Sequence, residues 1–218
     1  MNRFSLTLLF ILISITLMAT HERAGEIIYT HVEGLTYRVK IITYTYAPSP
    51  ADRPELDISW GDGTISTLPR SDFIDLNAEI RRNEYEGQHT YAGGGTFKLS
   101  VEDPNRNFGI VNIPNSVNIP FYIETELIIN PFLGGNNSVV LLNPPLDEGC
   151  VNKLYVHNPG AYAPDGDSLS YRLTVCRGAG GQPIPGYELP EATNEFKIDE
   201  MTGDLIWDVP IIQGEYNV

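Results

Sequence analysis

Four side chains in the C-terminal half of the chain carry oxygen atoms that could bind a cation. Asp165 and Asp167 are separated by one glycine, Asn158 precedes them, and Asp199 follows. Ca²⁺ takes six to eight hard oxygen ligands, and an Asp-x-Asp loop supplies such atoms. No glutamate stands at the twelfth position counted from Asp165, so the EF-hand loop is incomplete. Acidic residues beside glycine also form ordinary turns. Two alternatives follow: a structural Ca²⁺ that stiffens a domain boundary, or turns without a metal.

A second polar set lies in the N-terminal half. Trp60 is followed by Gly61, Asp62 and Gly63, so Asp62 stands between two glycines. His89 and Tyr91 follow later in the chain. Glycine permits positive φ, and an aspartate can accept hydrogen bonds from neighbouring backbone amides. The set is interpreted either as a small polar site or as turn and corner chemistry around a buried tryptophan.

Signatures of catalysis are missing from the sequence. It contains no Gly-x-Ser-x-Gly, no His-Glu-x-x-His and no phosphate-binding loop. The acidic residues show no spacing that selects a pair for glycoside hydrolysis. We therefore expect a protein that is not an enzyme. The histidines are interpreted as structural or exposed; they are His21, His31, His89 and His157.

The sequence has two cysteines, Cys150 and Cys176. In an exported chain, a disulfide between them is the expected state, and two buried thiols are the alternative. No Cys-x-x-Cys or pair of histidines completes a metal site around them.

Composition and the N-terminus indicate export. Arg3 precedes an apolar run from Leu6 to Met18, which is the layout of a secretory signal peptide. We assign it residues 1–24, with cleavage between Ala19 and Gly25; a retained anchor is the alternative. The 28 acidic and 14 basic residues give a net charge of −14, which disfavours nucleic acid and anionic membranes as partners. No later segment is apolar and long enough to span a membrane.

Alternating short segments predict an all-β fold of two tandem immunoglobulin-like sandwiches, 25–145 and 146–218, divided near Asn143-Pro144-Pro145. Residues 68–88 are the least strand-like, and a helical turn is expected near Ile74 to Ile80. Strands are expected at 25–32, 36–46, 56–60, 96–102, 121–129, 139–142, 154–157, 169–175, 196–198, 205–207 and 216–218.

The first module resembles the polycystic-kidney-disease (PKD) type of immunoglobulin-like domain over 25–103. Its matching motifs are Trp60-Gly61-Asp62-Gly63, His89-Thr90-Tyr91, Gly95-Thr96-Phe97, Val101 and Asp103. A long insert from Ile65 to Gln88 departs from the family pattern. The resemblance implies a structural role for Trp60, Asp62, His89 and Tyr91.

The second module resembles cadherin-like and immunoglobulin-like modules of bacterial surface proteins. It has Asp165-Gly166-Asp167, Ile198-Asp199 and Thr202-Gly203-Asp204-Leu205-Ile206-Trp207. Four further stretches resemble one family most closely: Ala24-Gly25-Glu26-Ile27-Ile28-Tyr29, Arg53-Pro54-Glu55-Leu56, Ile113-Pro114-Asn115-Ser116-Val117 and His157-Asn158-Pro159-Gly160-Ala161-Tyr162. With them, the two modules together resemble gliding-motility-associated surface proteins of Bacteroidetes. That resemblance implies export to the outer cell surface and further sequence, with a sorting domain, beyond Val218.

These observations predict a non-catalytic structural or adhesion module of a longer surface protein. Its partners would be other domains of the same chain and a surface polysaccharide or protein ligand. The alternative is a carbohydrate-binding accessory region of a secreted hydrolase, since sugars stack on exposed aromatic rings. The side chains that test this alternative are Tyr44, Tyr46 and Tyr162.

Overall fold

The structure is a computed structural model that describes residues 22–104 and 106–218. Most of the predicted signal peptide therefore lies outside the described residues, as do His21 and the apolar run. Its last three residues, Glu22–Ala24, lie in the first strand, and Glu22 is fully buried.

The N-terminal half begins with the predicted hairpin. β1 (Glu22–Glu33) pairs antiparallel with β2 (Thr36–Tyr46), and Gly34 turns the chain with a φ of 55°. Alternate residues point inward, so Ile27 and Tyr29 are buried on β1. The period-two pattern of the sequence thus predicted both strands and the buried face.

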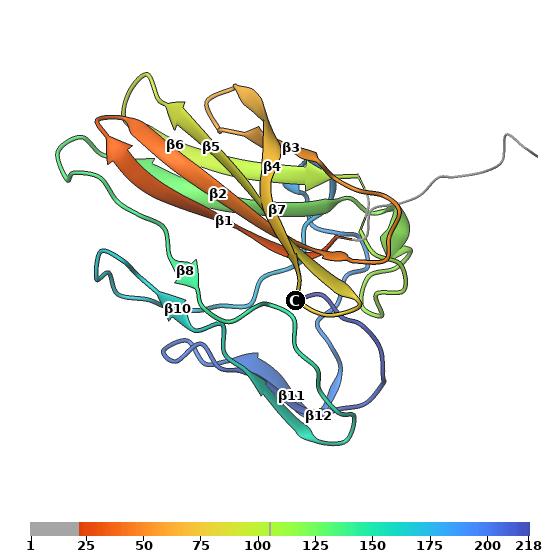
Figure 1. Ribbon diagram of the computed structural model, residues 1–218. Coiled ribbons are helices and arrows are strands. Elements are labelled where there is room, and N and C mark those ends of the chain that lie inside the picture. Colours follow the sequence, from red (N-terminus) through yellow and green to blue (C-terminus); the bar gives the residue numbers. More distant parts are fainter. Residues whose placement is uncertain (1–21, 105) are drawn as a thin grey trace, which may run out of the picture.

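Seven strands form one antiparallel sheet in the order β1-β2-β5-β4-β3-β6-β7 (Figure 1). The sheet folds over on itself: β1 and β7 are its two edges, yet they approach each other, and the Tyr29 hydroxyl donates to the Glu126 carbonyl at 3.3 Å. The all-β prediction is confirmed. The other strands are β3 (Glu55–Ser59), β4 (Ile65–Asp75), β5 (Ile80–Thr90), β6 (Gly95–Asp103) and β7 (Phe121–Ile129).

The prediction of a helical turn within 68–88 is wrong. This segment supplies most of β4 and β5, joined by a turn in which the Asn77 side chain accepts from the amides of Glu79 and Ile80. The first part of β4 pairs with β3, and the part from Arg70 onward pairs with β5, with a register shift before Asp72. β4 therefore links the two layers of the sheet.

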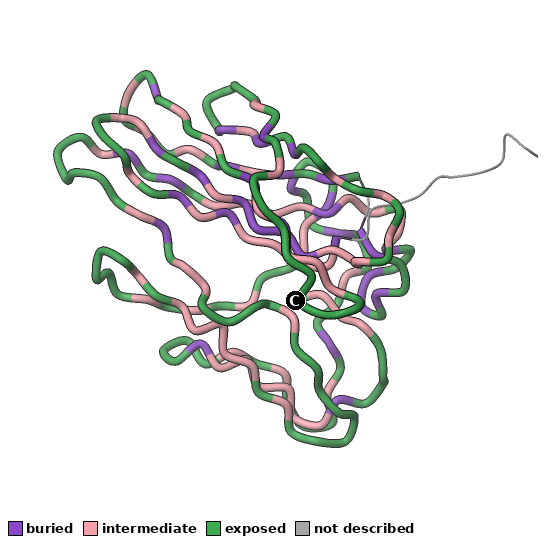
Figure 2. Tube along the Cα trace, in the orientation of Figure 1, coloured by how far each residue is buried: buried purple, intermediate pink, exposed green. Residues whose placement is uncertain are grey.

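The main core lies between the two layers. Figure 2 shows buried segments along β1 to β7 and mostly exposed or intermediate residues in the C-terminal part. Every strand from β1 to β7 contributes. The most deeply buried apolar side chains are Tyr37, Val39, Ile41, Ile58, Trp60, Tyr85, Leu99, Val101 and Leu127.

The C-terminal half has smaller sheets. β9 (Leu154–His157), β11 (Ala192–Ile198) and β12 (Leu205–Pro210) form a three-stranded sheet, and β8 (Val140–Leu141) pairs with β10 (Ala161–Tyr162). The strands predicted at 169–175 and 216–218 are not formed. Tyr171 instead donates its amide to the Glu200 carbonyl, and Glu215 forms an isolated β-bridge with Ile110 instead of starting a strand.

Residues beyond 145 do not build a large core of their own. Apart from Pro190 and Pro210, Ile184 is the only described buried apolar side chain from this region, and it packs with Ile110 and Ile113. The η2 turn (Ala179–Gly181) lies against the first sheet, where the Gly180 amide donates to Glu102 at 2.7 Å. Two separate immunoglobulin-like modules thus remain a prediction.

No helix within the described ranges is long and apolar enough to cross a membrane.

Candidate functional site

The motif that follows β3 forms a tight corner. The Trp60 amide donates to the Thr64 carbonyl at 3.1 Å, with Gly61 at φ 80° and Gly63 at φ 91°. A Cβ on Gly61 would lie 2.5 Å from the Lys98 backbone nitrogen on β6. Gly61 is therefore required both by its φ and by its contact with the neighbouring strand.

Asp62 connects the corner to β5. One carboxylate oxygen accepts from the Thr64 amide at 3.0 Å and from the Thr64 hydroxyl at 2.6 Å. The other oxygen lies 2.7 Å from His89 Nε2. The bonds from Thr64 and His89 favour the charged form and lower the pKa of Asp62 to about 2. The Asp62 carboxylate therefore holds two chain segments together.

His89 is also fixed by aromatic contacts. Its ring stacks on Trp60 with centroids 4.8 Å apart and meets Tyr91 edge-on at 4.7 Å. The Tyr91 hydroxyl donates to the Trp60 carbonyl, and the indole nitrogen donates to Ser66. A carboxylate bonded to an imidazole is also part of a hydrolase triad. Here, however, the Thr64 hydroxyl donates to the carboxylate rather than to the imidazole.

The structure does not bring the four predicted calcium ligands together. Asp165 accepts from both the backbone and side-chain nitrogens of Asn137, at 2.6 and 2.8 Å. Asn158 donates to Thr202 and Asp204, in the same turn region as Asp199. Asp199 accepts from the amides of Met201 and Thr202, which lowers its pKa.

Asp167 lies close enough to Tyr29 to help raise the pKa of that phenol, after the larger effect of burial. The described residues contain no group of three or more His, Cys, Asp or Glu placed to hold a metal ion. The predicted ligands thus lie as two pairs: Asp165 and Asp167 near Tyr29, and Asn158 and Asp199 at the turn that contains Thr202.

The predicted disulfide is not formed. Cys150 is exposed in a loop before β9, whereas Cys176 packs against the small cluster of Ile110, Ile113 and Ile184. Burial raises the pKa of the Cys176 thiol. The expectation from redox compartment alone did not account for the separate environments of the two residues.

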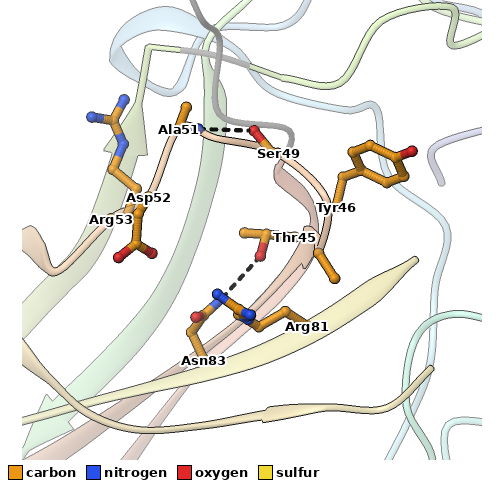
Figure 3. Close-up of a pocket in the computed structure, with 9 residues that line it drawn as sticks. Thr45, Tyr46, Ser49, Ala51, Asp52, Arg53, Arg81 and Asn83 are labelled. Atoms are coloured by element: carbon orange, nitrogen blue, oxygen red, sulfur yellow. Dashed lines mark hydrogen bonds between the residues drawn. The ribbon is translucent and has the colours of Figure 1, made fainter. Parts of the chain in front are cut away.

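A small polar pocket lies beside the end of β2 (Figure 3). Thr45, Ser49, Arg53, Arg81 and Asn83 are among its lining residues, and its free volume is only about 10 Å³. Its guanidinium groups already have carboxylate partners, because Arg53 bonds Asp103 and Arg81 bonds Asp75. This pocket has room for about one water molecule and no space for a sugar ring.

The three tyrosines of the carbohydrate-binding alternative are separated. Tyr44 is buried, Arg23 covers the ring of Tyr46 at 5.4 Å, and Tyr162 is 55% exposed. The sequence did not single out a different aromatic row, Phe196–Trp207–Tyr155, which crosses the three-stranded sheet. Its neighbouring rings are nearly perpendicular, with interplanar angles of 88° and 89°, so they do not form a flat platform.

A buried acid also escaped sequence interpretation, because Glu22 falls within the assigned leader. Its side chain is fully buried, and neither carboxyl oxygen makes a well-formed hydrogen bond among the described residues, although the Thr43 side chain lies near enough to lower its pKa. Burial raises its pKa well above the usual value, and the nearby Asp103 carboxylate adds to the shift. The only signal of this buried acid in the sequence would have been a polar residue at a core-facing position of β1.

No protein-family model matches the chain, and comparisons with curated proteins and with solved structures found no match.

Proposed function

We propose that this chain is a non-catalytic adhesion or structural module of an exported surface protein, and that it binds through loops at one end of its large sheet. Residues 25–145 would be a PKD-like immunoglobulin domain, and 146–218 would belong to a cadherin-like module. The buried Trp60 and its links to His89 and Tyr91 support the first assignment.

The observation that carries the proposal is the location of the two described ends. Arg23 forms an ion pair with Glu215 at 3.7 Å, and Asn217 donates to the Arg23 carbonyl at 3.5 Å. β1 leads away from this place to its turn with β2, so that turn lies at the opposite end of the sheet (Figure 1). Flanking chain would attach at one end and leave the opposite loops free to meet a ligand.

The polar motifs support a structural role. Asp62 and His89 bond each other and their neighbours, and Asp199 accepts amides within its own turn. These side chains are used to shape corners, which fits a scaffold that presents loops. A structural Ca²⁺ at the C-terminal acidic loops stays part of the proposal, as do export and a role in gliding motility.

Surface labelling tests the proposal. The turn between β4 and β5 is exposed at Asn77 to Glu79 and should accept an epitope tag. Antibody should label intact cells that carry the tagged full-length protein. Deleting residues 131–136 should reduce attachment of the cells to a surface without removing the label. Labelling only after cell lysis, or unchanged attachment with intact labelling, would contradict the proposal.

A further inference from the structure

Two large apolar side chains project from the loop that follows β7. Phe132 is 96% exposed and Leu133 is 83% exposed, which makes this pair the most exposed among the large apolar residues described. We call residues 131–134 the apolar tip. A contiguous exposed apolar patch is often a site of interaction.

The apolar tip is held in a defined shape. The Leu133 amide donates to the Asn130 carbonyl at 3.0 Å, and the Phe132 amide donates to the Asn130 side chain at 3.0 Å. Asn130 and Gly134 also form a bridge. The backbone of the turn that presents the two side chains is thus already ordered, so binding costs little further backbone entropy.

The chain after the tip is fixed as well. The Asn137 side chain accepts from the His31 amide at 2.9 Å, and Ser138 exchanges hydrogen bonds with the backbone of Tyr29 at 2.9 Å. Gly135 lies directly against the His31 ring, since a Cβ there would come within 2.1 Å of it. The loop is therefore fastened to β1 on one side and to β7 on the other.

An apolar cavity lies at the opposite end of β7. It has a volume of about 120 Å³ and is lined by Phe108, Gly109, Ile110, Ile113, Asn115, Ser116 and Val117. We call it the apolar hollow. Ile110 and Ile113 are buried at its floor, while Phe108 is 78% exposed. The Ser116 hydroxyl is bonded to the Asn107 carbonyl and the Ile110 amide, which leaves apolar surface for a ligand.

The tip and the hollow have complementary character. The hollow approaches the size of the ~150 Å³ apolar cavities that take up benzene, so it suits one aromatic or branched side chain. The residues of the hollow precede Phe121 and the tip follows Ile129, so the nine residues of β7 separate them. At a rise of about 3.3 Å per residue, that separation is roughly 30 Å. A chain cannot place its own tip in its own hollow.

We propose that the partner of the apolar tip is the apolar hollow of a second copy of this chain. The contact is heterologous, because each copy uses its tip toward one neighbour and its hollow toward the other. Repeated head to tail, it generates an open chain of copies. The inference names a ligand for the proposed adhesion module and so rests on that function. The contact is small, and dense display on a surface would strengthen it through effective concentration.

Sedimentation velocity over a concentration series tests the contact at physiological ionic strength, where repulsion between acidic copies is screened. The unmodified protein should form species that grow beyond the dimer. Phe132→Asp in the tip and Phe108→Asp at the rim of the hollow should each weaken association at least about tenfold. Phe73→Asp is the matched control, since Phe73 is 51% exposed on the β4–β5 hairpin, and it should associate like the unmodified protein.

A mixture of the two variants gives the sharpest result. The Phe108→Asp protein keeps its tip and the Phe132→Asp protein keeps its hollow, so an equimolar mixture should form a dimer that does not grow. A mixture that stays monomeric, an unmodified protein that stays monomeric, or equal loss in the Phe73→Asp control would overturn the inference. Cell attachment that persists when self-association is absent would leave the proposed function standing and remove only this ligand.

Discussion

The imidazole of His89 lies parallel to the indole of Trp60, with centroids 4.8 Å apart and an angle of 14° between the planes. The two residues belong to different layers of the folded sheet: Trp60 follows β3, while His89 lies on β5. A carboxylate oxygen of Asp62 lies 2.7 Å from Nε2 of the same imidazole. The ring thus closes the end of the core and links it to the Gly61–Gly63 turn.

Replacing His89 by Ala should expose the indole of Trp60, which is now only 1% exposed. We expect a loss of about 1–2 kcal/mol from the free energy of unfolding, through lost aromatic packing and a lost hydrogen bond. Urea denaturation and tryptophan emission measure it, in a Trp207→Phe background. Emission should shift to the red. His89→Phe should keep the stacking and the blue emission; equal behaviour of both variants would contradict a packing role.

The pH dependence of stability should report Asp62. Its pKa is about 2 in the folded protein against an ordinary value of 3.8, so the folded state favours the carboxylate. The contribution is present above pH 3.8 and is lost as pH falls toward 2. Partial exposure limits it to under about 1 kcal/mol. Carbon-detected NMR titration should show the low pKa, and Asp62→Asn should remove this part of the acid transition. An Asp62 midpoint near 4 would contradict the bonded geometry.

Two glycines in one turn provide a matched pair. Gly61 and Gly63 both have positive φ, but only a Cβ on Gly61 would strike the backbone of Lys98. Both alanine variants should lose about 1 kcal/mol or more through the strained φ. Gly61→Ala should lose about 1–3 kcal/mol beyond that, because backbone must move. Chemical denaturation compares them, and equal stabilities would show that β6 does not constrain the turn.

Glu22 should make the protein less stable as pH rises. Burial, followed by the Asp103 charge, raises its folded pKa well above the ordinary 4.5. The stabilising contribution of the neutral acid is complete below that ordinary value and is lost as pH rises through the folded pKa. Glu22→Gln should therefore raise the free energy of unfolding at pH 8 by about 1–3 kcal/mol, and with it the melting temperature. At pH 4 the substitution should have little effect.

The control for Glu22 is the exposed Glu33 on the same strand. Glu33→Gln should leave the pH dependence of melting as it is in the unmodified protein. If the melting temperature of the Glu22→Gln protein follows the same pH curve as that of the unmodified protein, the buried acid does not titrate in this range.

Strands with a regular apolar alternation were predictable. Ile, Val, Leu or Tyr side chains lie on one face of β1, β2, β3, β6 and β7, so the sequence predicted each of these strands near its observed position. β5 was missed because its inward positions include Asn83, Gly87 and His89, which carry no apolar period. Leu68 fills the space above Gly87, where a Cβ would lie 2.5 Å from it. Leu68 lies in the part of β4 that pairs with β3, so only the packing of this part against β5 reveals why glycine stands there.

The polar sites were likewise only partly predictable from the sequence. The turn chemistry of Asp62 follows from its two neighbouring glycines, whereas the contact with His89 joins residues far apart in sequence. The segment from Leu169 to Val175 shows the opposite failure: its alternation predicts a strand, yet it finds no neighbouring strand to pair with. Local pattern cannot supply that partner, because strands need a ladder of hydrogen bonds.

The two cysteines should react as separate thiols. Cys150 is exposed and should be alkylated rapidly in the native, unreduced protein. Cys176 is half-buried, and the raised pKa of its thiol lowers the fraction of reactive thiolate, so it should react slowly until the protein is denatured. Mass spectrometry of labelled peptides distinguishes the two sites. Cys150→Ser should leave both the melting temperature and the labelling of Cys176 unchanged, because no bond joins them. If neither residue is labelled in denatured, unreduced protein, the two are bridged, and the separation seen between the exposed loop and the Ile110–Ile113–Ile184 cluster is wrong.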